Sequence, residues 1–260
     1  LADVRLAFAQ AGVVRPGALL PADAAHVRKL LPEGFVREFI EHLAMLEVDV
    51  VRLDGLSTAY SFTVEGRPVI LLPESGNWFY ENWSLAHELG HLALGHEGVI
   101  AGATGSDAGE RAANAFAAEL LLPAATMRQI AWDRINVSAV AELVWEWGTS
   151  TGAVRHRLNA LALEPSAAVA EVLTWTTQKL LRWHWKGSKV GDPITKRMTE
   201  AGERSFPSWL QEAHLERIAE GAVGKGTLAW MLGVPEESLE VDEPEEASEL
   251  SDDDLAALLG

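Results

Sequence analysis

The stretch SLAHELGHLALGHEG, residues 84–98, constrains the fold of this chain more than any other segment. It is apolar overall, yet it carries three histidines and two glutamates. His87, Glu88 and His91 form the pattern H-E-x-x-H, and residues four apart lie one turn above each other on the same face of a helix. We therefore expect a largely buried helix whose two imidazoles reach a single ion.

Zinc binds imidazole nitrogens and carboxylate oxygens, and a catalytic zinc site keeps one position for water. The chain has no cysteine, so any metal must be held by nitrogen and oxygen ligands. Glu88 is adjacent to the first histidine, where its carboxylate can take a proton from water and pass it to a leaving amine. The pattern predicts a zinc-dependent active site with Glu88 as the catalytic acid and base. The plainer alternative is a half-exposed helix with polar decoration.

The third metal ligand is open among four residues. Glu97 stands where the longer metzincin pattern has its last histidine, but that pattern needs a glycine in place of Leu94. His96 falls at an awkward angle on a continuing helix. Glu110 begins a second apolar helix, ERAANAFAAELLLP, which could deliver its carboxylate by packing across the first. We favour Glu110, with Glu119 of the same helix as a further alternative.

Together, AHELGHLALGH and the later ERAANAFAAELLLP resemble the ImmA/IrrE family of bacterial metallopeptidases. The resemblance covers residues 45–125. It implies a zinc site of His87, His91 and Glu110, with Glu88 as acid and base, although Mn²⁺ or Fe²⁺ could occupy such a site. It also implies a small three-stranded sheet beside the active-site helix.

The same resemblance implies a cytoplasmic zinc-dependent endopeptidase that cleaves a protein partner. The implied partner is an XRE-type helix-turn-helix repressor or antitoxin in a bacterial stress or mobile-element response, so the protein would act in transcription regulation. A second function stays open, that of a catalytically dormant metal-binding regulatory protein acting through its helical C-terminal half. No membrane partner is expected, because no apolar run approaches the length that spans a bilayer.

The charge pattern bears on nucleic-acid binding. The net charge is −17, and eleven acidic residues lie between residues 236 and 254, where there is no lysine or arginine. Contacts to phosphates need a basic face. The segment STGAVRHRLNALAL, residues 150–163, resembles the second helix of a helix-turn-helix but has few basic residues around it. Direct DNA binding is therefore not expected.

The hydrophobic periodicity predicts an α+β fold that is mostly helical. Residues 1–47 place apolar residues at helical spacing. Residues 48–73 instead show an alternating pattern, interrupted by glycine and proline residues, which predicts two or three short strands. The helix with the histidines is expected to begin near Asn82 or Ser84 and to stop near Gly98. Almost all of the chain after Pro123 is expected to be helical.

Three domains are expected. Residues 1–130 form a zincin-like metallopeptidase domain. Residues 131–235 form a helical, helix-turn-helix-like domain for substrate recognition or regulation. Residues 236–260 form an acidic, flexible tail.

Further residues are candidates for contacts to the substrate or the transition state, namely Tyr80, His96 and Arg111. Each also has a plainer reading, as a packing aromatic, a surface histidine and a solvent-facing arginine. Asn114 is expected to cap or brace the loop between the two helices. PVILLPE, residues 68–74, is a candidate edge strand that pairs with an extended substrate, and a buried strand is the alternative.

Overall fold

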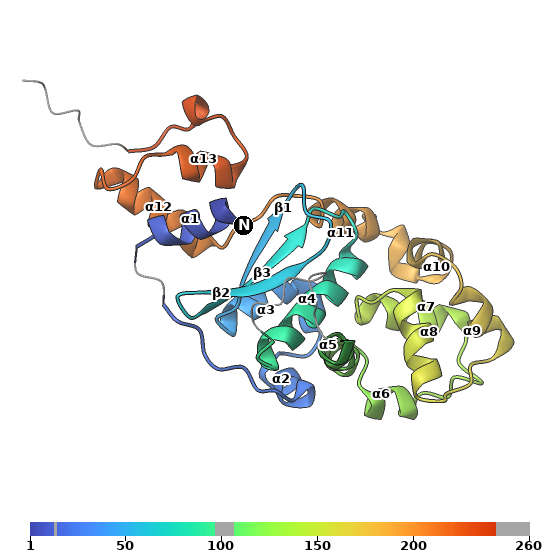
Figure 1. Ribbon diagram of the computed structural model, residues 1–260. Helices are drawn as coiled ribbons and strands as arrows, with labels where there is room; N and C mark the ends of the chain where they lie inside the picture. Colours follow the sequence, from blue (N-terminus) through green and yellow to red (C-terminus); the bar gives the residue numbers. More distant parts are fainter. Residues whose placement is uncertain (13–14, 97–106, 243–260) are drawn as a thin grey trace, which may run out of the picture. The chain divides into compact units, whose positions relative to one another are not determined.

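The computed structural model describes residues 1–12, 15–96 and 107–242 (Figure 1). The chain forms two compact units, one of Leu1–Val13 with Ser208–Gly260 and the other of Val14–Pro207. Glu97 and most of the expected acidic tail lie outside the described residues. The expected domain boundaries at residues 130 and 235 stay predictions.

A three-stranded mixed sheet lies in the larger unit. Its strands are β1 (Asp49–Leu53), β2 (Tyr60–Val64) and β3 (Arg67–Pro73), in the order β1-β3-β2. β3 pairs parallel with β1 and antiparallel with β2. This confirms the α+β class and the small sheet. Of the two alternatives for residues 68–74, the buried strand is confirmed and the edge strand is wrong, because β3 is the central strand. A continuous apolar run is typical of a strand that is buried on both faces.

Helices make up most of the rest of this unit, as expected. Before the sheet come α2 (Ala24–Leu30), a 3-10 turn (Phe35–Glu38) and α3 (Phe39–Met45). After it come α4 (Trp78–Ala93), α5 (Asp107–Leu121), α6 (Ala124–Gln129), α7 (Val137–Glu146), α8 (Thr151–Ala160), α9 (Ala167–Val172), α10 (Thr177–His184), a 3-10 turn (Lys186–Lys189) and α11 (Pro193–Glu200).

Helix α4 carries the H-E-x-x-H pattern, and both of its ends differ from the expected positions. It begins at Trp78 rather than near Asn82 or Ser84, because the side chain of Asn77 caps it by accepting the N–H of Tyr80. It ends at Ala93 rather than near Gly98. Gly95 adopts a φ of +69°, which turns the chain back after the last helical turn.

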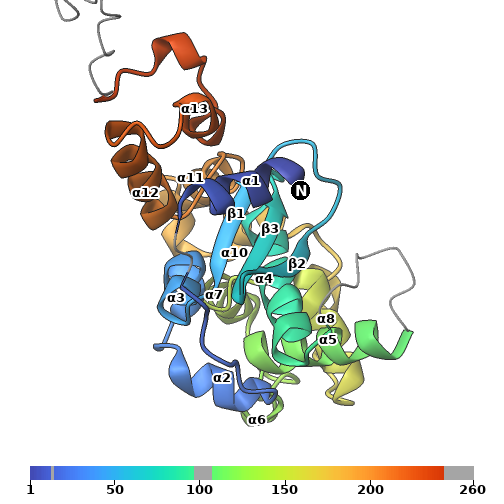
Figure 2. The ribbon, with the colours of Figure 1, turned by 60° about the vertical axis from the view of Figure 1, so that its left-hand side comes forward.

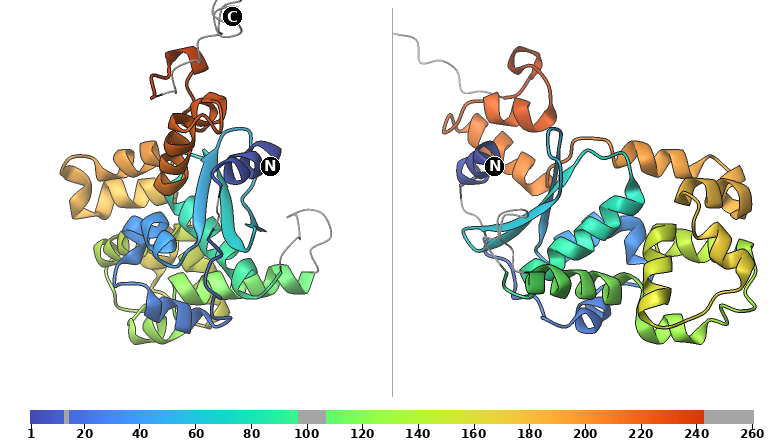
Figure 3. Two further views of the ribbon diagram at one scale, coloured as in Figure 1. Left: turned by 90° about the vertical axis from the view of Figure 1, so that its left-hand side faces the viewer. Right: turned by 45° about the vertical axis from the view of Figure 1, so that its right-hand side comes forward.

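Helix α4 lies between the sheet and α5, as the right-hand view of Figure 3 shows. It packs against β2 and β3 on one side and makes an extensive contact with α5 on another. The absence of a side chain at Gly90 permits the close approach of α5. A Cβ atom there would lie 3.1 Å from the Cβ of Phe116 and 3.2 Å from the carbonyl oxygen of Ala113. The fold thus brings the start of α5 beside the histidines of α4.

A buried ion pair ties α4 to strand β1. The guanidinium of Arg52 donates from Nε and Nη2 to the two carboxylate oxygens of Glu81, at 2.7 and 2.8 Å. Arg52 also donates to the carbonyl oxygen of Glu203 at 3.0 Å. Burial of the pair restricts its geometry, so the ion pair helps to set the position of α4 relative to the sheet.

The C-terminal helices of this unit pack on one another around tryptophan side chains. Helices α7 and α8 are joined by a short turn, and α7 contacts α9 and α10. The rings of Trp145 and Trp185 stack with their centroids 4.0 Å apart, and the indole N–H of Trp185 donates to Glu142 at 2.7 Å.

The smaller unit consists of α1 (Ala2–Gln10), α12 (Ser208–Ala219), α13 (Gly226–Leu232) and a 3-10 turn at Glu236–Ser238 (Figure 2). His214 is fully buried, and its Nε2 lies 2.8 Å from the carbonyl oxygen of Ala7.

Across the part of the chain that the structure describes, no helix combines the length and apolarity needed to cross a bilayer.

Candidate metal centre

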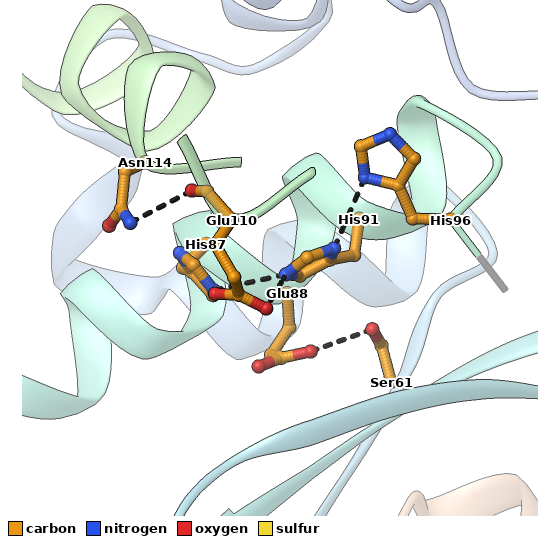
Figure 4. Close-up of polar contacts among 7 residues, drawn as sticks. All are labelled: Ser61, His87, Glu88, His91, His96, Glu110 and Asn114. Atoms are coloured by element: carbon orange, nitrogen blue, oxygen red, sulfur yellow. Dashed lines mark hydrogen bonds and ion pairs between the residues drawn. The ribbon is translucent and has the colours of Figure 1, made fainter. Parts of the chain in front are cut away.

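The two histidines of the H-E-x-x-H pattern converge with a glutamate from α5 (Figure 4). The Nε2 atoms of His87 and His91 lie 3.1 Å apart. The carboxylate of Glu110 lies 3.3 Å from Nε2 of His87 and 3.5 Å from Nε2 of His91. Among the residues that the structure describes, these three form the group that could hold a metal ion.

The spacing of the three side chains fits a tetrahedral metal site. Zinc bonds nitrogen and oxygen ligands at about 2.0–2.1 Å, so two ligands of a regular tetrahedron lie about 3.3–3.4 Å apart. The two histidine nitrogens are 3.1 Å apart, and Oε2 of Glu110 lies 3.3 Å from Nε2 of His87, both close to this value. The 3.5 Å distance to Nε2 of His91 is that of the other carboxylate oxygen, Oε1. Two histidine nitrogens and one carboxylate leave a fourth position open, which is the arrangement of a catalytic rather than a structural zinc site.

Glu88 lies beside this group, and a residue of the sheet donates a hydrogen bond to its carboxylate. The residue is 5% exposed, and its Oε2 accepts a hydrogen bond of 2.7 Å from the hydroxyl of Ser61 on β2. Burial raises the pKa of the Glu88 carboxyl, whereas the hydrogen bond from Ser61 and the charge of His87 lower it. The net effect is a raised pKa, the direction that suits a carboxyl that must first accept a proton and then donate it.

His96 contacts the metal group through His91. Because α4 ends before Gly95, the chain folds back, and Nδ1 of His96 lies 3.3 Å from Nδ1 of His91. His96 thus contacts Nδ1 of His91, whereas Nε2 of His91 is the atom near Glu110. His96 is therefore placed to orient the His91 ring rather than to be a ligand. Burial is the largest of the effects that lower the pKa of His91, which keeps the imidazole in the neutral form that binds metals.

The structure separates the candidate ligand Glu119 from the group. Glu119 lies on the same helix as Glu110, about 13 Å further along its axis. There it pairs with Arg157 and accepts the backbone N–H of Ala124. Glu97 lies outside the described residues.

The residues expected to contact a substrate or to brace the loop lie on α4 and α5 or directly after α4. Arg111 is exposed on α5, next to Glu110. Tyr80 is 41% exposed and lies on α4, two turns before His87. The predicted roles of Arg111, Tyr80 and His96 toward a substrate stay predictions. Asn114 donates to the carbonyl oxygen of Glu110 within α5 at 2.8 Å. Most of the loop between the two helices lies outside the described residues, so the expected role of Asn114 toward that loop stays a prediction.

Ser61 is a site residue that the sequence patterns did not indicate. It lies on a short alternating strand next to the buried Phe62, and a serine at such a position is ordinarily a solvent-facing residue. Only the packing of α4 against β2 places its hydroxyl at Glu88.

Comparison with known proteins agrees with this geometry. Residues 46–159 match the family of IrrE N-terminal-like domains. The match runs from just before β1 to the last turn of α8 and includes His87, Glu88, His91 and Glu110. The chain matches no curated protein and no solved structure. The resemblance to the ImmA/IrrE family is thereby confirmed over these residues.

Proposed function

Because residues 46–159 match the family of IrrE N-terminal-like domains, we propose that the protein is a zinc-dependent endopeptidase. One observation carries this proposal. The ligand atoms of His87, His91 and Glu110 all lie within 4.8 Å of one another. The buried Glu88 carboxyl follows directly on the same helix.

The residues divide the work of peptide hydrolysis. His87, His91 and Glu110 would hold a zinc ion, which would supply a Lewis acid for the peptide carbonyl and for water. Glu88 takes a proton from the attacking water and passes it to the amine of the leaving peptide. Ser61 keeps the Glu88 carboxylate in one orientation, and its hydrogen bond limits the rise in pKa that burial causes.

The proposed substrate is a protein partner, an XRE-type helix-turn-helix repressor or antitoxin. Cleavage of such a partner would switch on a stress response or a mobile element in a bacterial cytoplasm. This finer proposal rests on the resemblance of residues 45–125 to the ImmA/IrrE family.

Metal analysis tests the centre first. We expect about one zinc ion per chain in the purified protein and a sharp loss in Glu110→Ala, because three protein ligands are needed to hold a catalytic zinc. Glu119→Ala is the matched control, since it removes a carboxylate from the same helix. Equal zinc in both variants would exclude Glu110 as a ligand. No zinc in the unmodified protein, even after zinc is supplied, would overturn the proposal.

A cleavage assay then separates an active peptidase from a dormant metal-binding regulator. The zinc-loaded protein is incubated with purified XRE-type repressors and with a mixed peptide library, and the products are identified by mass spectrometry. New cleavage products that disappear when the zinc is chelated would support the peptidase. Full zinc occupancy without any cleavage would favour the dormant regulator.

A further inference from the structure

An open pocket lies on α4 beyond the metal centre, toward the start of the helix. Its walls are the first two turns of α4 and the first turns of α8 and α10, and its volume is about 690 Å³. This volume is within the range of about 300–1,000 Å³ that is usual for ligand pockets. Nothing in the proposed hydrolysis uses this pocket.

The pocket and the metal ligands share one face of α4. Tyr80 and Trp83 line the pocket, and they precede His87 by seven and four residues, spacings that return to the same side of a helix. With a rise of about 1.5 Å per residue, Trp83 lies about 6 Å and Tyr80 about 10 Å from His87 along the helix axis. An extended peptide covers these distances in about two and three residues.

The chemistry of the walls favours an apolar side chain. Phe79, Tyr80 and Trp83 line this pocket together with the small residues Gly152 and Ala153 of α8. His156 also lines it, but no Asp, Glu, Lys or Arg does. A charged side chain would therefore find no permanently charged partner there, whereas an aromatic ring would find surfaces to pack against.

Several hydroxyl groups at the rim are already engaged. The side chain of Ser150 accepts the N–H of Ala153, and that of Thr176 accepts the N–H of Lys179. The hydroxyl of Thr151 donates to the carbonyl oxygen of Trp175 at 2.7 Å. Because these hydroxyl groups already have hydrogen-bond partners, the aromatic side chains are the main surface against which a ligand can pack.

We propose that this pocket binds a large apolar side chain of the substrate, aromatic by preference, one to three residues from the cleaved bond. The pocket thereby selects the sequence that is cut. This inference rests on the proposed peptidase function, because only a peptide anchored at the metal places its neighbouring side chains at this distance.

The test uses peptide hydroxamates, which bind a metal through a group that is independent of the pocket. The compounds form pairs that differ only in having Phe or Ala at one position. The varied position is the first, second or third residue from the hydroxamate, and each is tested on both sides of that group. Dissociation constants are measured by calorimetry on the zinc-loaded full-length protein. At one position or more, we expect the compound with Phe to bind at least about tenfold more tightly than the compound with Ala.

A variant that fills the pocket makes the test specific. A Cβ atom at Gly152 would meet only the hydroxyl of Ser150, at 3.7 Å, and Gly152 lines the pocket, so we expect the side chain of Gly152→Leu to occupy part of it. The control is Gly224→Leu, where a Cβ atom meets nothing within 4 Å. We expect Gly152→Leu to lose the preference for Phe and Gly224→Leu to keep it, with the same zinc content in both.

The outcomes distinguish this inference from its premise. Equal binding of the Phe and Ala compounds at every position, or an unchanged preference in Gly152→Leu, would overturn the pocket as a specificity site while leaving the metal centre intact. Failure of all compounds to bind the zinc-loaded protein would overturn the proposed function and this inference with it.

Discussion

The hydroxyl of Ser61 lies 2.7 Å from Oε2 of Glu88 and joins strand β2 to the helix of the metal centre. Glu88 is buried, and the strand supplies its hydrogen-bond donor. The position of the carboxylate therefore depends on the packing of α4 against the sheet as well as on the helix itself.

The hydrogen bond from Ser61 makes a first prediction for the pH dependence of catalysis. This bond lowers the pKa of Glu88, so Ser61→Ala raises that pKa further. A higher pKa leaves less of the ionised base at low pH, so the acid limb of kcat/KM should move to higher pH. The maximal kcat/KM should fall roughly tenfold, since hydrogen bonds to charged groups are among the stronger ones.

Initial rates across a pH series check this expectation. The control is Ser57→Ala, which makes the same change at an exposed residue and should leave the profile unchanged. An acid limb that stays in place in Ser61→Ala would show that the hydroxyl does not influence Glu88.

Glu88→Gln separates catalysis from metal binding. The amide keeps the shape of the side chain but cannot take up the proton, so cleavage should fall by about 10²–10⁴-fold. Zinc content should stay at the level of the unmodified protein, because Glu88 is not among the three candidate ligands. Loss of zinc together with activity would instead place Glu88 in the ligand set.

The metal centre could be predicted from the sequence because it depends on local spacing. His87 and His91 share a face of any helix that contains them, and Glu110 lies in the first turn of a helix with one strongly apolar face. Packing such a face against the buried α4 leaves few positions for that carboxylate. The convergence of the three side chains thus follows from two helical patterns and one contact.

Features that depend on tertiary contacts could not be predicted in this way. An apolar run such as β3 reads alike in a central or an edge position, because periodicity does not report neighbouring strands. Ser61 became a site residue only through its contact with Glu88. The first turn of α4 was missed because its aromatic residues have weaker helix propensity than the residues after them, and the cap at Asn77 outweighs this.

The buried ion pair of Arg52 and Glu81 predicts a large effect on stability. Glu81→Ala leaves the Arg52 guanidinium buried without its partner, so we expect a loss of about 3–5 kcal/mol in the free energy of unfolding. The control is Glu146→Ala, which breaks the exposed pair with Arg37 and should cost no more than about 1 kcal/mol. Urea unfolding at fixed pH measures both. Similar losses in the two variants would show that the buried pair has no special role in holding α4.

His214 predicts that the smaller unit becomes less stable in acid. Burial is the main cause of its lowered pKa, so the folded unit resists a proton that the unfolded chain accepts below about pH 6.5. The unfolded state then binds more protons, and stability falls as the pH drops through this range. Hydrogen exchange in α12 should accelerate more between pH 7.5 and pH 5.5 than the intrinsic rate explains. His214→Gln, which keeps a donor for Ala7, should remove this excess, and a variant as sensitive as the unmodified protein would contradict it.

Gly90 links helix packing to the affinity for metal. In Gly90→Ala the new methyl group would lie 3.1 Å from the Cβ of Phe116, so α5 must shift by a few tenths of an ångström. Because Glu110 is on α5, its carboxylate moves away from the histidines, and zinc affinity should fall roughly tenfold, as for other changes outside the ligand set. Alanine has the higher helix propensity, so a loss of affinity could not be attributed to a weaker helix. Competition with a chromogenic chelator measures the zinc dissociation constant, with Gly224→Ala as the control in open space. Unchanged zinc affinity in Gly90→Ala would mean that Glu110 follows α4 despite the shift, or that it contributes little to binding.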